Sequence, residues 1–251
     1  MAEIIELVFL GIGVGALSGF FGIGGGTILV PALLFIGFGM KEAVGISVVQ
    51  MVFSSIYGSY LNLKKGTLDV KMVMAIGVGG FVGALGSSFI VTALSARTLE
   101  WIFMGFVLFA LGRLFMHTAE QTQEGTRKAH PVLLFFIGLL LGAFSISIGV
   151  GGSILLVPIL AGFLHVPLKN AISAGLFFVV FSSLSGLISL SLGGYIDYKH
   201  GLIIGIASMA GVFGGIWLKH VVPVKQHKML MIAFYLVVIS YFFYRLVVKH
   251  G

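Results

Sequence analysis

The sequence predicts an all-α, polytopic membrane protein made of two homologous halves, with about eight to ten membrane segments in all. Composition and an internal repeat lead to this fold class. Of 251 residues, 59% are hydrophobic and only 9% are charged, whereas a soluble domain has about 25% charged residues. Uncharged runs recur along the chain, and a spanning helix needs about 20 such residues. The chain also matches itself when it is shifted by 127 residues.

The repeat is clearest at a glycine-rich motif. Residues 22–31 (GIGGGTILVP) align with residues 149–158 (GVGGSILLVP), and six of the ten residues are identical. After a one-residue insertion the match continues as far as Gly86, which aligns with Gly214. The repeat divides the chain into a first half at 1–118, a polar linker at 119–130 and a second half at 131–251.

Each half is expected to form five helical segments. The first ends at the glycine cluster, the second is the short apolar run after it, and the third ends at a glycine-containing turn. The fourth begins at an Asp-X-Lys motif, and the fifth completes the half. The expected segments are 4–21, 27–39, 42–63, 70–94 and 97–116, then 132–148, 153–165, 169–192, 200–218 and 228–248. The second segments have about 12 residues, which at ~1.5 Å per residue cover little more than half of a ~30 Å hydrocarbon core.

The basic residues favour an inverted orientation of the two halves. If the first two segments of a half both cross the membrane or form a re-entrant pair, the halves are inverted; if they form one broken crossing, the halves are parallel. Cytoplasmic loops are enriched in Lys and Arg. The inverted arrangement places ten basic residues inside and five outside, against nine and six for the best parallel arrangement. The ten are Lys64, Lys65, Lys71, Arg113, Arg127, Lys128, Lys169, Lys219, Lys225 and Lys228.

The two glycine clusters predict a binding site. Each glycine costs roughly 1 kcal/mol against alanine inside a helix, so each cluster should break the helix. Short, glycine-interrupted segments at matching positions of two halves are typical of transporter sites. Each break precedes a new helix, whose first N–H groups lack partners and carry partial positive charge. We expect the two helix ends to bind a small anion without a fixed cation. The expected binding residues are Gly22, Gly24, Gly25, Gly26, Thr27, Gly149, Gly151, Gly152 and Ser153.

Polar residues of the third segments are further candidates. Gln50, Ser54 and Ser182 are expected in the substrate-binding site, although serines in membrane helices also bond to their own helix. Gln50 aligns with Phe178, so it either recognises the substrate on one side or only joins two helices.

Asp69 and Asp197 begin the fourth segments. Their position fits acids at a helix N-terminus best, and gating or proton coupling is the alternative role.

Other functional classes fit the sequence poorly. The glycines could serve only close helix packing, as expected for Gly11, Gly15 and Gly19. The chain has no cysteine, and no HxxxH or carboxylate cluster suggests a metal site or another cofactor. No nucleophile, base and orienting residue recur together, so an enzyme is not expected. The expected partners are a small anion and the lipid bilayer, not nucleic acid; a homo-oligomer stays open.

At these motifs the sequence resembles the TauE/SafE sulfite exporter family. The resemblance rests on residues 19–26 (GFFGIGGG) with Val30-Pro31, on residues 149–152 (GVGG) with Val157-Pro158, and on the turns before Asp69 and Asp197. It implies a multi-pass transporter of the bacterial or archaeal cytoplasmic membrane. The resulting hypothesis is a secondary transporter that exports sulfite or an organosulfonate. A passive anion channel, or a membrane binding or assembly protein without transport, is the alternative.

Overall fold

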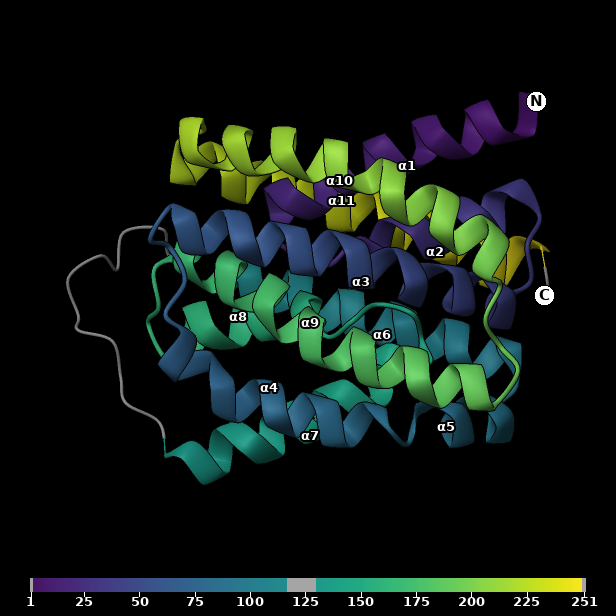
Figure 1. Ribbon diagram of the computed structural model, residues 1–251, viewed down its shortest axis with the longest axis horizontal. Coiled ribbons are helices and arrows are strands. Elements are labelled where there is room, and N and C mark those ends of the chain that lie inside the picture. Colours follow the sequence, from purple (N-terminus) through teal and green to yellow (C-terminus); the bar gives the residue numbers. More distant parts are fainter. Residues whose placement is uncertain (1, 117–129, 250–251) are drawn as a thin grey trace.

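The computed structural model describes residues 2–116 and 130–249, and every regular element within them is a helix (Figure 1). The helices of the first half are α1 (Ala2–Phe21), α2 (Gly26–Ile36), α3 (Met40–Lys64), α4 (Val70–Ala84), α5 (Ser87–Ala93) and α6 (Ala96–Met116). Those of the second half are α7 (Pro131–Ser147), α8 (Ser153–Phe163), α9 (Leu168–Leu192), α10 (Tyr198–Val221) and α11 (Val224–Phe243), continued by a π-helix, η1 (Tyr244–Lys249). Most of the polar linker, together with Arg127 and Lys128, lies outside the described residues.

Length and composition mark several of these helices as membrane spans. Among the described residues, five helices are long and apolar enough to cross a membrane: α1, α3, α9, α10 and α11. A sixth span results if α4 and α5 are counted together. The helices α2, α7 and α8 are apolar but shorter, at 10–17 residues. The all-helical, multi-pass class expected from the sequence is therefore confirmed, with five or six candidate spans rather than eight to ten.

The helix breaks fall at the two glycine clusters. The first helix ends at Phe21 and the next begins at Gly26, and the corresponding gap in the second half runs from Ser147 to Ser153. The short helices that follow have 11 residues each. Each contains a proline in its second turn, Pro31 or Pro158.

One expected segment is interrupted. The sequence predicts a single helix at 70–94, but α4 and α5 are separate and bent by 44°, whereas α10, at the equivalent position, is continuous. The Ser189 hydroxyl donates to the Leu85 carbonyl at 2.8 Å and accepts from the Ser88 amide at 3.1 Å. Hydroxyls from a neighbouring helix thus satisfy backbone groups that the break releases, which makes such a break tolerable inside a membrane.

The two halves are interlocked. The helix α1 packs on α10, and α7 packs in the same way on α4, so each half lends its first helix to the fourth helix of the other half. The short helices follow the same rule, since α2 contacts α11 and α8 contacts α6. At the centre α3 and α9 cross, and they run in opposite directions (Figure 1). Gly45 near the start of α3 packs on Tyr195 just beyond the end of α9.

Glycines let the interlocked helices touch through their backbones. Gly11, Gly15 and Gly19 of α1 face the carbonyls of Ile204, Ser208 and Val212 on α10, where an added methyl group would collide. The expected packing role of these three glycines is confirmed. Small residues serve this purpose in membranes because helices gain contact only when their backbones come close.

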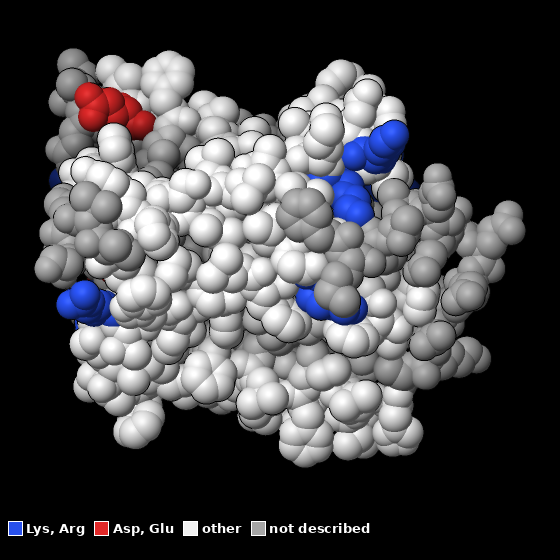
Figure 2. Space-filling view, turned by 180° about the vertical axis from the view of Figure 1, so that it is seen from behind, with Lys and Arg blue, Asp and Glu red and all other residues white. Residues whose placement is uncertain are grey.

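The outer surface suits a bilayer. On the face in Figure 2, a band without charged side chains separates charged residues that lie toward the two ends of the molecule. Large apolar side chains such as Phe9, Phe213 and Val237 are exposed. Such exposure is favourable in lipid and costly in water.

The packing predicts that Gly15→Leu disrupts folding. The added side chain would meet the Ser208 backbone, and overpacking of this kind typically costs about 1–3 kcal/mol or more. We expect a lower melting temperature and a smaller folded fraction in detergent size-exclusion profiles. Gly13→Leu is the matched control, because nothing lies within 4 Å of the Gly13 position. Equal stability of the two variants would contradict the packing role.

Candidate functional site

Both glycine breaks require backbone conformations that other residues rarely adopt. Gly22, Gly24 and Gly25 have positive φ angles of 72°, 73° and 83°, and the aligned Gly149, Gly151 and Gly152 repeat the pattern at 74°, 78° and 90°. Left-handed backbone of this kind strains any residue that has a Cβ atom. The aligned glycines therefore give the two breaks similar backbone conformations.

The two breaks meet inside the protein. Gly26, the first residue of α2, packs directly on the carbonyl of Gly149, so a methyl group at Gly26 would collide with it. Gly175 of α9 lies close to the carbonyl of Gly22, where an added Cβ would be 3.0 Å from the oxygen. All residues from 18 to 27 and from 145 to 158 are buried. The structure thus brings the two sequence-predicted glycine clusters into one buried region.

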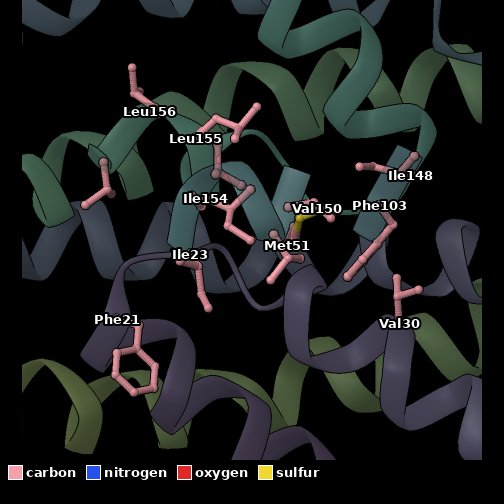
Figure 3. Close-up of a cluster of buried hydrophobic side chains, with 14 of the residues drawn as sticks. Phe21, Ile23, Val30, Met51, Phe103, Ile148, Val150, Ile154, Leu155 and Leu156 are labelled. Atoms are coloured by element: carbon pink, nitrogen blue, oxygen red, sulfur yellow. The ribbon is translucent and has the colours of Figure 1, made fainter. Parts of the chain in front are cut away.

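Apolar side chains that the sequence analysis did not single out fill the contact between the breaks. Met51 and Val179 occupy equivalent positions on α3 and α9. The Met51 sulfur lies against Gly26 and Gly151, and the Val179 methyl groups lie against Gly24 and Gly151. In Figure 3, Met51 stands in a buried apolar cluster that includes residues of both breaks. The substrate-binding site expected there is therefore closed by two hydrophobic side chains in this structure.

The predicted serines hold the breaks in place. The Ser54 hydroxyl donates to the Gly24 carbonyl at 3.4 Å, and the Ser182 hydroxyl donates to the Gly151 carbonyl at 2.9 Å. Each also lies within bonding distance of a carbonyl in its own helix. A hydroxyl has a single proton to donate, so each serine bonds either to the break or to its own helix, and the distances favour the break for Ser182.

Other predicted side chains are buried without a partner. Among the described residues, neither amide atom of Gln50 and neither hydroxyl of Thr27 and Ser153 makes a hydrogen bond, and all three residues are fully buried. The Gln50 amide lies against Gly25, directly before α2, whereas the Phe178 ring lies against Gly152, directly before α8. A buried polar group left unpaired costs about 1–3 kcal/mol, which a satisfied core would avoid.

The helix ends beside these side chains carry further unpaired donors. The first hydrogen bonds within α2 are donated by Ile28 and Leu29 to the Gly25 carbonyl, and in α8 the equivalent bonds run from Leu155 and Leu156 to Gly152. The amides that precede them have no intrahelical acceptor. Backbone amides, a carboxamide and two hydroxyls are neutral donors, a set that suits a small anion.

The two aspartates lie away from the breaks. Asp197 is the N-cap of α10, where its carboxylate accepts from the His200 amide at 3.1 Å. Burial raises the pKa of Asp197, but hydrogen bonds from the His200 side chain and backbone outweigh it and hold this pKa below the ordinary value. Asp69 is exposed just before α4. Their gating or coupling role stays a prediction, and no group of three or more His, Cys, Asp or Glu forms a metal site within the described ranges.

The sequence analysis did not predict that one lysine is buried. Lys219, which the sequence places at the end of an uncharged run, is 0% exposed in the last turn of α10. Its ammonium donates to the Asn62 carboxamide oxygen at 2.6 Å and to the Ser173 hydroxyl at 2.9 Å. The only hint in the sequence is its counterpart in the first half, Val91, because an aligned apolar residue marks a position that faces protein or lipid.

Comparison with known proteins identifies the family of the chain. The family model described as "Sulfite exporter TauE/SafE" matches residues 7–242. A "Probable membrane transporter protein" of Methanocaldococcus jannaschii is 31% identical over 191 residues, covering 73% of this chain and 70% of its own. Another of Bacillus subtilis is 24% identical over 226 residues, covering 88% and 91%. No solved structure matches. The chain belongs to the TauE/SafE sulfite exporter family, a family of membrane transporters and not of enzymes.

Proposed function

We propose that this protein is a secondary transporter that exports a small sulfur-containing anion, sulfite or an organosulfonate, across the cytoplasmic membrane. One observation carries the proposal. Two glycine breaks meet in the buried centre, and the Gln50 amide and the Thr27 and Ser153 hydroxyls lie there without hydrogen-bond partners among the described residues. Non-helical backbone is tolerated at membrane depth only where it is buried in protein or lines a cavity. Anion binding by the unpartnered donors would explain why the protein has two such breaks at its centre.

The donors define how the anion would be held. The N-terminal ends of α2 and α8 each present partial positive charge, and glycine lets a ligand approach the backbone amides without a side chain in the way. Gln50 beside α2 and Phe178 beside α8 make the site unequal. On this proposal the sulfur oxyanion lies nearer to α2, where Gln50 donates, and the apolar part of a sulfonate faces Phe178.

Transport requires the centre to open. Met51 and Val179 close the contact between the breaks, so a bound anion must separate them. We infer that this happens as the interlocked halves move relative to each other, as in alternating access. The closed apolar contact also weighs against the alternative of a permanently open channel.

Inverted halves fit the proposal. The equivalent helices α3 and α9 run in opposite directions (Figure 1), and Lys219 joins the end of α3 to the beginning of α9. Inversion supports a site at the interface of the two halves and an exchange of roles between them during transport.

Flux through proteoliposomes tests the function directly. A transporter should show saturable uptake of sulfite or methanesulfonate and should accelerate exchange when unlabelled anion is present on the opposite side. A channel would instead give flux that rises steadily with concentration and shows no counterflow. Absence of any sulfur-anion flux from folded protein would contradict the proposal.

The site predicts opposite effects of Gln50→Met on stability and on binding. Methionine keeps the length but removes the unpaired amide, which should stabilise the ligand-free protein by about 1–3 kcal/mol. Loss of a hydrogen bond to a charged ligand should weaken anion binding by about 1.5–3 kcal/mol. Melting curves with and without methanesulfonate measure both effects.

Ser55→Ala serves as the control for Gln50→Met. Ser55 is buried on the same helix, but its hydroxyl bonds to Val52 of that helix at 3.4 Å. We expect Ser55→Ala to keep the full ligand-induced shift in melting temperature. An unchanged shift in Gln50→Met as well would remove Gln50 from the binding site.

The inverted arrangement predicts that Lys65 faces the cytoplasm and Lys199 faces outside. Both are exposed, and the chain has no native cysteine, so Lys65→Cys and Lys199→Cys each introduce a unique thiol. A membrane-impermeant maleimide applied to intact cells should label only the second variant. Equal labelling of both would support parallel halves instead.

A further inference from the structure

A second polar cluster lies where α3 ends, α9 begins and α10 ends. The Lys219 ammonium donates to Asn62 and Ser173. The Thr67 hydroxyl lies 2.9 Å from the Ser173 hydroxyl, and the Lys169 ammonium donates to the His220 carbonyl at 3.1 Å. Ile172, directly before Ser173, packs on Gly22 at the start of the first break. The cluster therefore adjoins the site at the glycine breaks.

The cluster contains positive charge without an acid. The hydrogen bonds of Lys219 go to a neutral amide and a neutral hydroxyl, and among the described residues it forms no ion pair. The other charged side chain of the cluster, Lys169, is also basic. A buried charge is costly unless an opposite charge or hydrogen bonds compensate for it. Among the described residues neither Lys219 nor Lys169 forms an ion pair, so these two lysines lack such an opposite charge.

An unpartnered donor stands beside the lysine. The ammonium can only donate, so the oxygen of the Asn62 carboxamide must face it, and this fixes the orientation of the amide. The Asn62 nitrogen is buried and has no hydrogen-bond partner among the described residues, and the side chain as a whole is 0% exposed. The Asn62 nitrogen thus lacks an acceptor, and the two hydrogen bonds of the Lys219 ammonium leave one of its three N–H groups unused.

A purely structural role does not account for the cluster. A lysine in the last turn of a helix does interact favourably with the helix dipole. The first half, however, has Val91 at the position of Lys219 and Leu190 is the counterpart of Asn62 in α9. Both counterparts are apolar, and both lie in the same kind of helix ends. The fold can therefore be built there without a buried cation.

We propose that Lys219 and Asn62, supported by Ser173 and Thr67, form a capture site for a small oxyanion at the end of the molecule where α3 ends and α9 begins. The anion supplies the missing negative charge and accepts from the ammonium and from the free Asn62 amide. As a binding site it stands on its own contacts. Its role as a cytoplasmic binding site that the anion occupies before it reaches the glycine breaks rests on the proposed function.

Titration of charge-changing variants tests the binding. The protein is placed in nanodiscs of phosphatidylcholine, and sulfate and methanesulfonate are titrated calorimetrically at constant ionic strength against chloride. Lys219→Met should weaken binding by about tenfold or more, because charged hydrogen bonds are strong, without lowering the melting temperature of the ligand-free protein. Lys219→Arg keeps the charge and should keep most of the affinity. Unchanged affinity in Lys219→Met overturns the proposal, as does an equal loss in both variants together with a lower melting temperature.

A single introduced thiol locates the anion. Thr67→Cys places the chain's only cysteine beside Ser173, and sulfate should slow its alkylation by N-ethylmaleimide. This protection should vanish with the added Lys219→Met change but persist with Gln50→Met. Protection by phosphatidylglycerol alone would mean a lipid headgroup and overturn the proposal. Protection without sulfur-anion flux would refute the proposed function and leave the capture site standing.

Discussion

The structure depends on hiding non-helical backbone inside a membrane protein. Each glycine break leaves amides and carbonyls outside a helix, and lipid offers them no hydrogen bonds. The two breaks solve this problem together, because Gly26 of the first half packs on Gly149 of the second, while Ser54 and Ser182 lie beside the carbonyls of Gly24 and Gly151 within their own halves. Neither break could be buried in this way by its own half alone.

The interlocking of the halves follows from the same requirement. To surround both breaks, α3 and α9 must cross at the centre, and α1 and α7 must pack on α10 and α4 of the opposite half. The glycines of α1 allow that close approach. The bend between α4 and α5 is a smaller case of the same chemistry, since Ser189 replaces the lost backbone partners of Leu85 and Ser88.

Local patterns in the sequence were enough to predict the breaks, the short helices after them and the glycine contacts of α1. They could not predict features that depend on which helices become neighbours. In the sequence, Met51 and Val179 look like ordinary core residues. Their position between the two breaks becomes evident only from the packing of the breaks. Ser54 and Ser182 were expected to face a substrate, but the carbonyls that they bind come from segments about 30 residues away. Lys219 read as a loop lysine because only the packing of α3, α9 and α10 buries it.

What the halves share builds the fold, and what they do not share concerns recognition. The glycines of the breaks and the supporting serines occur in both halves. The unpartnered polar groups at the breaks themselves differ, since Gln50 aligns with Phe178 and Thr27 with Ile154, whereas Ser18 and Ser145, which also lack partners, align with each other. On the proposed function this asymmetry sets how tightly the anion is held at each stage. On the further proposal, Lys219 beside the beginning of α9 attracts the anion over distance, whereas the centre offers only neutral donors. A fixed cation at the centre would bind the anion more tightly and slow its release. Charge at one end and neutral donors at the centre therefore favour transport of the anion over its tight retention.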